Sequence, residues 1–203
     1  MIVTEITGDN ASSVAEDVAR IHADAYSREH FSATFGFDKL REYNLLLIEN
    51  SDISLVAMDG VHAVGFVISG TGVSRGVSEF TRRNRAFLIR TLLCHPVFLL
   101  DKISGKLKAV FSRPAPSAAR YRLLSIATDP KAQSKGVGAA LLAALEQRLR
   151  ERGVPRYGLS VRKGNPRAVE FYRRNGFTQE KEQTGSLYFV KELNSWMGTH
   201  SNP

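Results

Sequence analysis

Apolar and polar residues follow two different periods along the chain, and these predict strands and helices in turn. A short apolar run at residues 2–6 predicts a first strand. Apolar residues then recur at helical spacing from Val14 to Ala25, after Ser12 or Ser13 as a suitable N-cap. The amino-terminal part is therefore expected to be a strand followed by an amphipathic helix.

The next part of the chain combines a second helix with a hairpin. From Asp38, a suitable N-cap, to Asn50 the spacing is again helical. Two β-rich runs, 53–58 and 61–69, flank the dipeptide Asp59-Gly60, which favours a type I′ turn. We expect the two runs to pair as antiparallel neighbours.

The carboxyl-terminal half repeats the alternation. The pattern predicts a strand over 121–129, an amphipathic helix over 137–153, a strand over 156–161, a short helix over 165–176 and a last strand over 186–193. Helices placed between strands of one sheet predict an α/β (α+β) fold.

Residues 71–120 join the hairpin to the strand at 121–129 and carry the net charge of the protein. Two helical patterns, 78–93 and 97–111, stand on either side of Pro96. The basic residues of this segment are Arg75, Arg82, Arg83, Arg85, Arg90, Lys102, Lys106, Lys108, Arg113 and Arg120. Only Glu79 and Asp101 oppose them, so the whole formal charge of +8 lies here. Such a segment favours an anionic partner.

Composition indicates a globular chain with a sizeable core. Of the 203 residues, 43% are hydrophobic and 24% are charged, which argues against disorder. We expect a single domain over 1–193, with 71–118 as a helical insertion and 194–203 as a flexible tail. Cys94, the one cysteine, excludes a disulfide within one chain, and the sequence shows neither a signal peptide nor a membrane span. These features predict a cytoplasmic protein.

A loop with two glycines, Q-S-K-G-V-G at residues 133–138, precedes the long helix. Gly136 and Gly138 would let the backbone turn tightly and let a ligand approach bare N–H groups. A helix start has unpaired N–H groups and the positive end of the helix dipole, which suits a phosphate or pyrophosphate. Ordinary turn chemistry would explain the same glycines. The loop lacks the Gly-Lys-Ser/Thr end of a P-loop and the third glycine of a dinucleotide fingerprint.

A second motif, N-P-R-A-V-E-F-Y-R-R-N-G-F at residues 165–177, follows after one more strand. Asn165 is a suitable N-cap, Pro166 suits the first helical turn and Gly176 follows the helix. In order and spacing the two motifs resemble those of the GNAT superfamily of acyl-CoA-dependent N-acyltransferases, closely so over residues 121–177. The resemblance implies a mixed, mostly antiparallel central sheet flanked by helices. The basic segment has no counterpart in it and would be an insertion before the cofactor-binding strand.

The resemblance also implies which residues bind acetyl-CoA. The backbone of one strand would pair with the pantetheine arm, the loop amides would hold the pyrophosphate, and the second motif would face the pantetheine end. The set is Ile126, Ala127, Thr128, Gln133, Ser134, Lys135, Gly136, Val137, Gly138, Ala139, Asn165, Ala168 and Phe171. A backbone N–H near Ala127 is the implied oxyanion donor. Tyr172 is the implied general acid for the leaving thiolate, because a phenol is protonated at neutral pH. A plain core position is the other interpretation of Tyr172.

The general base is not identified by the sequence. The strand at 121–129 has no glutamate before Asp129, at the edge of the loop, and a chain of water molecules is an alternative. His22, His30, His62 and His95 are candidates because histidine titrates near neutrality, although each also fits an ordinary structural position. His30 lies nearest to where the family builds its acceptor wall. No spacing typical of metal ligands is present.

The basic segment is consistent with three interpretations. It is the solvated face of an inserted helical pair, a lid over an anionic acceptor, or a patch for a membrane surface or nucleic acid. Its apolar side would pack on the sheet or on a second subunit of a homodimer.

The predicted function is transfer of an acetyl group from acetyl-CoA to a primary amine of a small molecule, with a nucleotide-linked amino sugar as the leading acceptor. An amine of a protein or peptide is an alternative acceptor. A non-catalytic acyl-CoA-binding or regulatory module is the alternative from another class.

Overall fold

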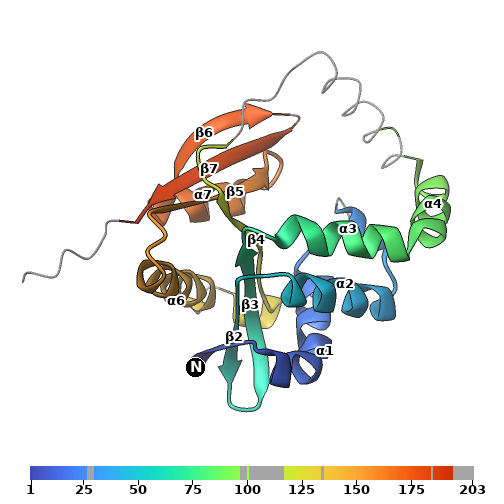
Figure 1. Cartoon of the computed structure of the whole chain (residues 1–203), viewed down its shortest axis with the longest axis horizontal. Helices are drawn as coiled ribbons and strands as arrows, with labels where there is room; N and C mark the ends of the chain where they lie inside the picture. Colours follow the sequence, from blue (N-terminus) through green and yellow to red (C-terminus); the bar gives the residue numbers. More distant parts are fainter. Residues whose placement is uncertain (27–29, 97–99, 101–116, 134, 184, 194–203) are drawn as a thin grey trace, which may run out of the picture.

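The computed structural model describes residues 1–203 apart from 27–29, 97–99, 101–116, 134, 184 and 194–203 (Figure 1). Its centre is a 7-stranded sheet in the order β1-β2-β3-β4-β5-β7-β6. Among the described strands β4 and β5 form the only parallel pair, and the other neighbours are antiparallel. The strands are β1 (Ile2–Glu5), β2 (Ile53–Asp59), β3 (His62–Gly70), β4 (Tyr121–Thr128), β5 (Arg156–Arg162), β6 (Thr178–Gln183) and β7 (Ser186–Glu192).

Helices cover both faces of this sheet. Figure 1 shows α6 and α7 on one side of the strands and α1, α2 and α3 on the other. The helices are α1 (Gly8–Ala25), α2 (Phe37–Glu49), α3 (Val73–Arg83), α4 (Arg85–Cys94), α6 (Val137–Glu151) and α7 (Pro166–Arg174), with short 3₁₀ helices η1 (Phe31–Thr34) and η2 (Pro130–Ala132). The expected mixed, mostly antiparallel sheet flanked by helices is therefore confirmed.

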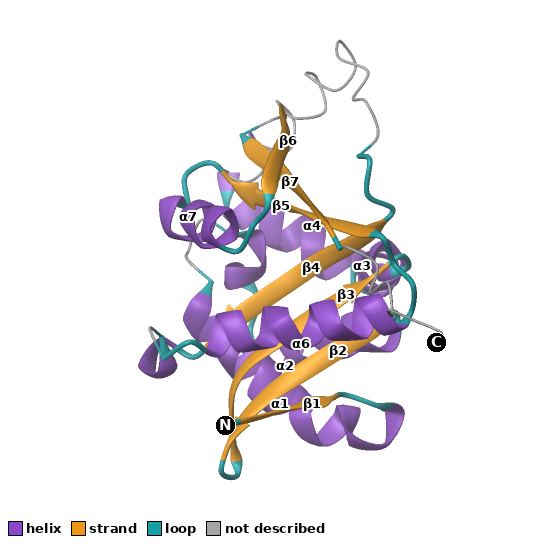
Figure 2. Cartoon of the chain, turned by 90° about the vertical axis from the view of Figure 1, so that its left-hand side faces the viewer, coloured by secondary structure: helices purple, strands orange, loops and turns teal. Residues whose placement is uncertain are grey.

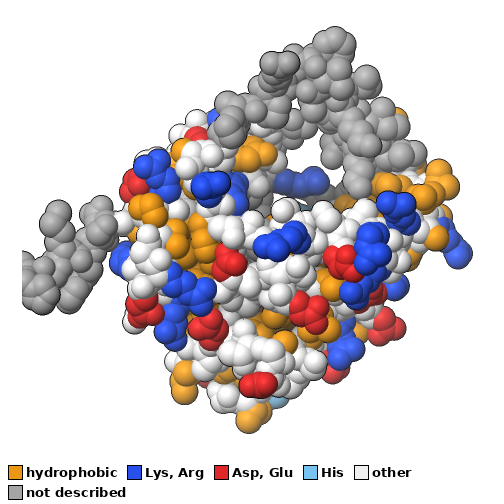
Figure 3. All heavy atoms as spheres, viewed as in Figure 1, with side chains coloured by type: hydrophobic (Ala, Val, Ile, Leu, Met, Phe, Trp, Pro, Cys, Tyr) orange, Lys and Arg blue, Asp and Glu red, His pale blue; other side chains and the backbone are white. Residues whose placement is uncertain are grey.

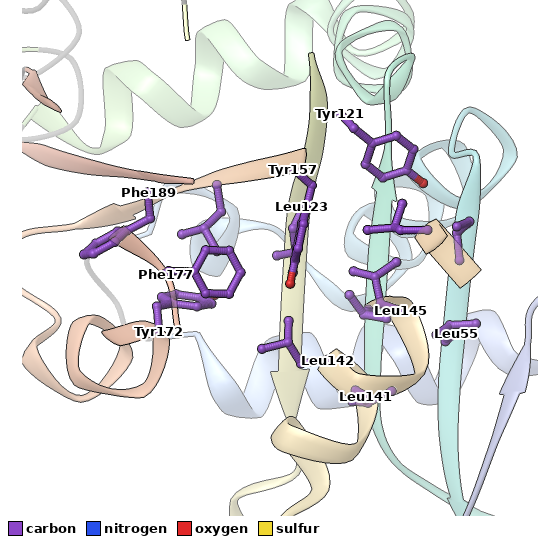
Figure 4. Close-up of a cluster of buried hydrophobic side chains, with 14 of the residues drawn as sticks. Leu55, Tyr121, Leu123, Leu141, Leu142, Leu145, Tyr157, Tyr172, Phe177 and Phe189 are labelled. Carbon is purple, nitrogen blue, oxygen red and sulfur yellow. The ribbon is translucent and has the colours of Figure 1, made fainter. Parts of the chain in front are cut away.

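Two clusters of buried apolar side chains hold the layers together. One packs α6 and α7 on the sheet and includes Leu141, Tyr157 and Phe189, which are fully buried. Figure 4 shows these side chains converging from the helices and strands around them. The other cluster packs α1 and α2 on the opposite face and includes Val18 and Phe66. Apolar burial of this extent is the main source of stability in such a fold.

Both amino-terminal helices begin earlier than the sequence suggested. α1 starts at Gly8 with Thr7 as N-cap, not at Ser12 or Ser13, because Asn10 Oδ1 accepts a bond from the backbone N–H of Thr7 at 2.8 Å. α2 starts at Phe37 after Gly36 as N-cap, so Asp38 lies in the first turn and does not cap the helix. A negative charge there still interacts favourably with the helix dipole.

The basic segment does not form one helix over 78–93. It forms α3 and α4, which meet at Asn84, a buried residue. The Asn84 side chain donates to the carbonyl of Phe80 at 3.2 Å and to Glu42 Oε1 of α2 at 2.8 Å. These bonds hold the helix end at this point, and they explain the break. The helix predicted over 97–111 and the predicted tail at 194–203 lie outside the described residues, apart from Leu100.

Two features of the sheet also differ from the expectation. The hairpin loop is Gly60-Val61, one residue later than predicted, because Asp59 still pairs with His62. Gly60 has φ of 62°, a conformation that favours glycine. The edge strand β6 was not predicted, because its sequence T-Q-E-K-E-Q has no apolar alternation.

Candidate functional site

The sheet opens between β4 and β5. The two strands pair only at Tyr121 and Arg122 of β4, and Figure 2 shows them diverging from that junction. β4 nevertheless continues to Thr128, held by β3 alone. Residues 123–128 therefore have one edge that no described strand pairs with, and such an edge can pair with an extended ligand.

β4 also contains a bulge beside this opening. Ser125 pairs with Ile68 and Leu123 pairs with Ser69, so Leu124 between them has no partner in β3. A bulge residue is left out of the ladder, and the bulge re-aims the backbone around it. The opening is thus lined by backbone groups of β4 that the sheet does not use.

The three strand residues predicted to bind the pantetheine arm lie just beyond the bulge. Ile126, Ala127 and Thr128 pair with β3 on one side only. The side chain of Ala127 is buried under α1 and α2, and that of Ile126 packs on the opposite face. Their side chains thus serve the fold, while their backbone faces the opening.

The predicted pyrophosphate loop has the conformation of an anion site. Gly136 is the N-cap of α6 and has φ of 77°, in the left-handed region. The first helical bond closes from the N–H of Ala140 to the carbonyl of Gly136 at 2.9 Å. No described residue accepts a bond from the N–H groups of Val137, Gly138 and Ala139. These three unpaired donors and the helix dipole favour a phosphate group.

The side chains of this loop divide into two groups. Gln133, Lys135 and Ala139 are exposed, so they can meet a ligand. Val137 is buried at 4% exposure, and only its backbone is available. Ser134 lies outside the described residues.

The second motif packs directly on the first. Asn165 caps α7, because its Oδ1 accepts a bond from the N–H of Ala168 at 3.0 Å. The ring of Phe171 lies close to Gly138, where an added Cβ would sit 3.4 Å from its Cζ. Gly176, with φ of 81°, follows the helix as predicted. The two motifs therefore line one end of the opening together.

Tyr172 combines a buried ring with a free hydroxyl. Its side chain is 7% exposed and packs edge-on against Phe171 and Phe177, with ring centroids 5.3 and 5.5 Å apart (Figure 4). No described residue bonds to its hydroxyl. Because the described residues contain no buried side-chain oxygen without a partner, that hydroxyl retains contact with solvent. Burial raises the pKa of Tyr172, so the phenol carries its proton at neutral pH.

Tyr26 is a site residue that sequence reasoning missed. Its hydroxyl lies 2.7 Å from Ser125 Oγ at the bulge. Burial raises the pKa of Tyr26, and a negative charge on Tyr26 would raise the pKa of Tyr172 as well. Tyr26 follows His22 by four residues and ends α1 as its C-cap, but nothing in the sequence indicates its partner on β4.

His22 does not have the properties of a general base. Its ring is buried, with Nδ1 3.0 Å from Asn44 Oδ1 and Nε2 3.1 Å from Ser32 Oγ. Burial lowers the pKa of His22 to about 4, so the ring is neutral at pH 7 and both of its nitrogens are engaged. His30 lies edge-on to Tyr26, with ring centroids 4.8 Å apart. His22 also stacks on this tyrosine, with its ring centroid 4.1 Å from that of Tyr26, so both histidines adjoin the same residue.

The other base candidates lie elsewhere or are engaged. His62 is exposed in the hairpin, and His95 caps the end of α4. Asp129 accepts one bond from the N–H of Lys131 and one from Arg20 Nη1, each 2.9 Å long. The bond from Lys131, followed by that from Arg20, lowers the pKa of Asp129. This carboxylate therefore anchors the loop after β4.

An open pocket of about 360 Å³ lies on the α3 face of the sheet, next to the junction of β4 and β5. It is lined by Ser74 and Ser78 of α3, Arg122 and Leu124 of β4, and Ser160 of β5. Leu124 is the bulge residue, so the pocket reaches the edge of the opening. Its size is within the range of small-molecule sites.

The arginines predicted to form a lid do not line this pocket. Arg82 and Arg83 both pair with Glu79 on α3, at 2.7 and 2.6 Å, and are exposed. Arg85 and Arg90 lie on the exposed side of α4. Figure 3 shows basic side chains gathered over this end of α3 and α4. The lysines predicted for the lid lie outside the described residues.

No group of three or more His, Cys, Asp or Glu side chains within the described part of the chain could hold a metal ion. None of the described helices is both long and apolar enough to cross a membrane.

Residues 15–177 match the Acetyltransferase (GNAT) family, and the chain belongs to that family. Members of the family use acetyl-CoA, which fits the unpaired amides at the start of α6 and the free edge of β4.

The individual relatives match only part of the chain. Mycothiol acetyltransferase of Beutenbergia cavernae is 38% identical over 78 residues, which is 38% of this chain and 26% of that protein. [Ribosomal protein bS18]-alanine N-acetyltransferase of Escherichia coli is 42% identical over 57 residues, which is 28% of this chain and 38% of that protein. The chain thus matches well under half the length of these two relatives.

A solved structure extends the likeness to the whole fold. PaiA N-acetyltransferase from Thermoplasma acidophilum, solved in complex with coenzyme A, superposes with a TM-score of 0.57 at 16% identity. The alignment covers 95% of this chain and 99% of that one. At this identity the likeness shows the fold alone.

Proposed function

We propose that this protein transfers an acetyl group from acetyl-CoA to a primary amine of a small molecule. The observation that carries the proposal is the free edge of β4 beside the unpaired amides at the start of α6. The hydroxyl of Tyr172 supports it as a third feature, because the pKa of Tyr172 responds to Tyr26, the partner of Ser125 on β4. The amides suit a pyrophosphate, the edge an extended pantetheine arm and the hydroxyl a leaving thiolate.

Each end of acetyl-CoA has its own residues in this proposal. The N–H groups of residues 136–139 bind the pyrophosphate, with Gln133 and the ammonium of Lys135 at the mouth of the site. The backbone of residues 126–128 pairs with the pantetheine arm. Asn165, Ala168 and Phe171 line the far wall, as the packing of α7 on Gly138 supports.

In this proposal the acetyl transfer takes place beside the bulge of β4. The amine nitrogen attacks the thioester carbonyl carbon, and a backbone N–H near Ala127 donates to the developing oxyanion. The carbon–sulfur bond breaks, and Tyr172 gives its phenolic proton to the leaving thiolate. The amine must lose one proton, which a chain of water molecules takes and returns to the Tyr172 phenolate. Tyr172 has a proton to give at neutral pH, because burial keeps its phenol protonated.

We propose a nucleotide-linked amino sugar as the acceptor. The net charge of +8 and its concentration in residues 71–120 support an anionic amine. The single, exposed Cys94 suits a reducing compartment, and the cytoplasm is the proposed location. The exposed Ile89 and Leu93 of α4 support a homodimer.

Thiol release from acetyl-CoA across a panel of amines, amino sugars and peptides tests the activity. We expect turnover with an amino sugar, and we expect Tyr172→Phe to lower kcat about 10²-fold while acetyl-CoA affinity stays the same. The variant retains the ring that packs on Phe171 and Phe177, so the fold is preserved. Acetyl-CoA binding without turnover on any amine would instead favour a regulatory module. Native kcat in Tyr172→Phe would assign that residue to the core alone.

A further inference from the structure

Arg122 is the one cation among the described residues that line the pocket on the α3 face. Arg122 lies at the last position where β4 pairs with β5, and its side chain is half-buried. It shares the pocket with the hydroxyls of Ser74, Ser78 and Ser160. Figure 3 shows a hollow above α3 with basic colouring inside it. A cation and several hydroxyls around one cavity are the groups that bind oxyanions.

Arg122 has donors that the fold does not use. A guanidinium has five N–H donors. The described residues accept one bond from Arg122, from Nη1 to Ser117 Oγ at 2.9 Å. The guanidinium also lies over the ring of Tyr188, 5.7 Å from its centroid. The remaining N–H groups are available to a ligand.

No described carboxylate forms an ion pair with Arg122. Glu180 is the carboxylate whose charge acts most on Arg122. Its oxygens already accept bonds from Ser117 Oγ at 2.8 Å and from the N–H of Ala118 at 2.5 Å. A half-buried cation without a paired anion pays a desolvation cost that a bound anion would offset. Arg82 and Arg83, by contrast, each form an ion pair with Glu79 on the surface of α3.

The pocket is also placed for an acceptor. Val77, another lining residue, packs into the core cluster under α1 and α2, so the pocket lies on that face of the sheet. Leu124, the bulge residue, also lines it. A molecule seated against Arg122 would therefore present its other end to the edge of β4, where the proposed thioester lies.

We propose that this pocket binds a phosphate group of the acceptor, with Arg122 as a bidentate donor and the hydroxyls of Ser78 and Ser160 as further donors. The inference rests on the proposed function, because it names what selects the acceptor of that transfer. A planar guanidinium matches two phosphate oxygens at once, which a lysine cannot do. Arg122 is thus the specificity-determining residue, in place of the surface arginines of α3.

Calorimetry with inorganic pyrophosphate tests the pocket without any turnover. The protein is first saturated with coenzyme A, so that the loop at the start of α6 is filled. We expect pyrophosphate to bind this complex, and Arg122→Gln to weaken binding at least tenfold. Arg120→Gln is the matched control, because Arg120 is exposed and does not line the pocket. It removes the same charge from the same strand region and should leave the affinity nearly unchanged.

A second variant tests the pocket independently, in case Arg122→Gln does not fold. Ser78→Asp leaves Arg122 in place and puts a carboxylate in the pocket, so it should abolish pyrophosphate binding. Absence of binding to the coenzyme A complex would overturn the proposal. Equal weakening by Arg120→Gln and Arg122→Gln would overturn it as well, because binding would then follow net charge alone.

A kinetic comparison separates this proposal from the proposed function. Glucosamine 6-phosphate and glucosamine differ only by the phosphate. In Arg122→Gln we expect KM to rise at least tenfold for the first and to stay unchanged for the second. If the unaltered protein and Arg122→Gln have the same KM for glucosamine 6-phosphate, the proposed pocket is wrong. Acetyl transfer in that case would still support the proposed function. A third outcome is that Arg122→Gln loses pyrophosphate binding while the unaltered protein acetylates no amine. That outcome would support the pocket and count against the proposed function.

Discussion

The left-handed glycine at the start of α6 allows a sharp test of the proposed pyrophosphate loop. Gly136 has φ of 77°, and an added Cβ would meet no atom within 4 Å. Gly136→Ala therefore introduces backbone strain without a clash. A residue other than glycine in this conformation costs roughly 1–2 kcal/mol. The chain can lower that strain by rotating the peptide groups around Gly136, which would turn the unpaired amides of Val137 and Gly138 away from a common ligand.

The same helix supplies the matched control. Gly153, just beyond the end of α6, has φ of 66° and also has open space around an added Cβ. Gly153→Ala should carry the same strain at a distance from the loop. Both variants should lower the melting temperature by a few degrees, since about 1 kcal/mol corresponds to ~2–4 °C in a chain of this size.

Affinity for acetyl-CoA then distinguishes the two ends of α6. We expect Gly136→Ala to weaken binding at least tenfold by calorimetry, which corresponds to about 1.4 kcal/mol. Gly153→Ala should bind acetyl-CoA like the unaltered protein. Equal affinities in the two variants would refute the assignment of this loop, whatever their melting temperatures.

Two further predictions concern the packing of α3 and the buried histidine. Gly76→Ala would bring its Cβ to 2.7 Å from the backbone oxygen of Leu46, so α3 should move away from α2 at a cost of about 1–3 kcal/mol in unfolding free energy. Gly8→Ala, with open space around its Cβ, is the control, and equal unfolding free energies in urea would contradict this contact. The pKa of His22 is lowered to about 4 in the folded protein. As the pH falls below 6.5, the unfolded chain therefore binds a proton at this residue that the folded chain does not bind until about pH 4. Stability should therefore fall by about 3 kcal/mol as the pH drops from 6.5 to 4 and then level off for this group. His22→Asn should remove that part of the pH dependence, and an unchanged slope would show that the ring is not the cause.

The parts of the site that depend on local chemistry could be predicted from the sequence. A glycine in the left-handed region at a helix start and an asparagine cap before a proline are both specified by their immediate neighbours. Gly136 and Asn165 accordingly lie where the two motifs placed them.

The parts that depend on distant contacts could not be predicted. The opening exists because pairing between β4 and β5 stops after Arg122, which no local pattern encodes. Tyr26 reaches its partner Ser125 across 99 positions of the chain. Asn84 divides a helical pattern by bonding to Glu42 of another helix. In each case a tertiary contact overrides or completes what the local sequence favours.

Hydrogen exchange with and without acetyl-CoA tests the central claim most directly, because it reports on backbone N–H groups one segment at a time. The account predicts that acetyl-CoA slows exchange at residues 136–139 and along 123–128 of β4, while the hairpin loop at Gly60 remains unaffected. Slowed exchange confined to other segments, with none in the opening between β4 and β5, would contradict it.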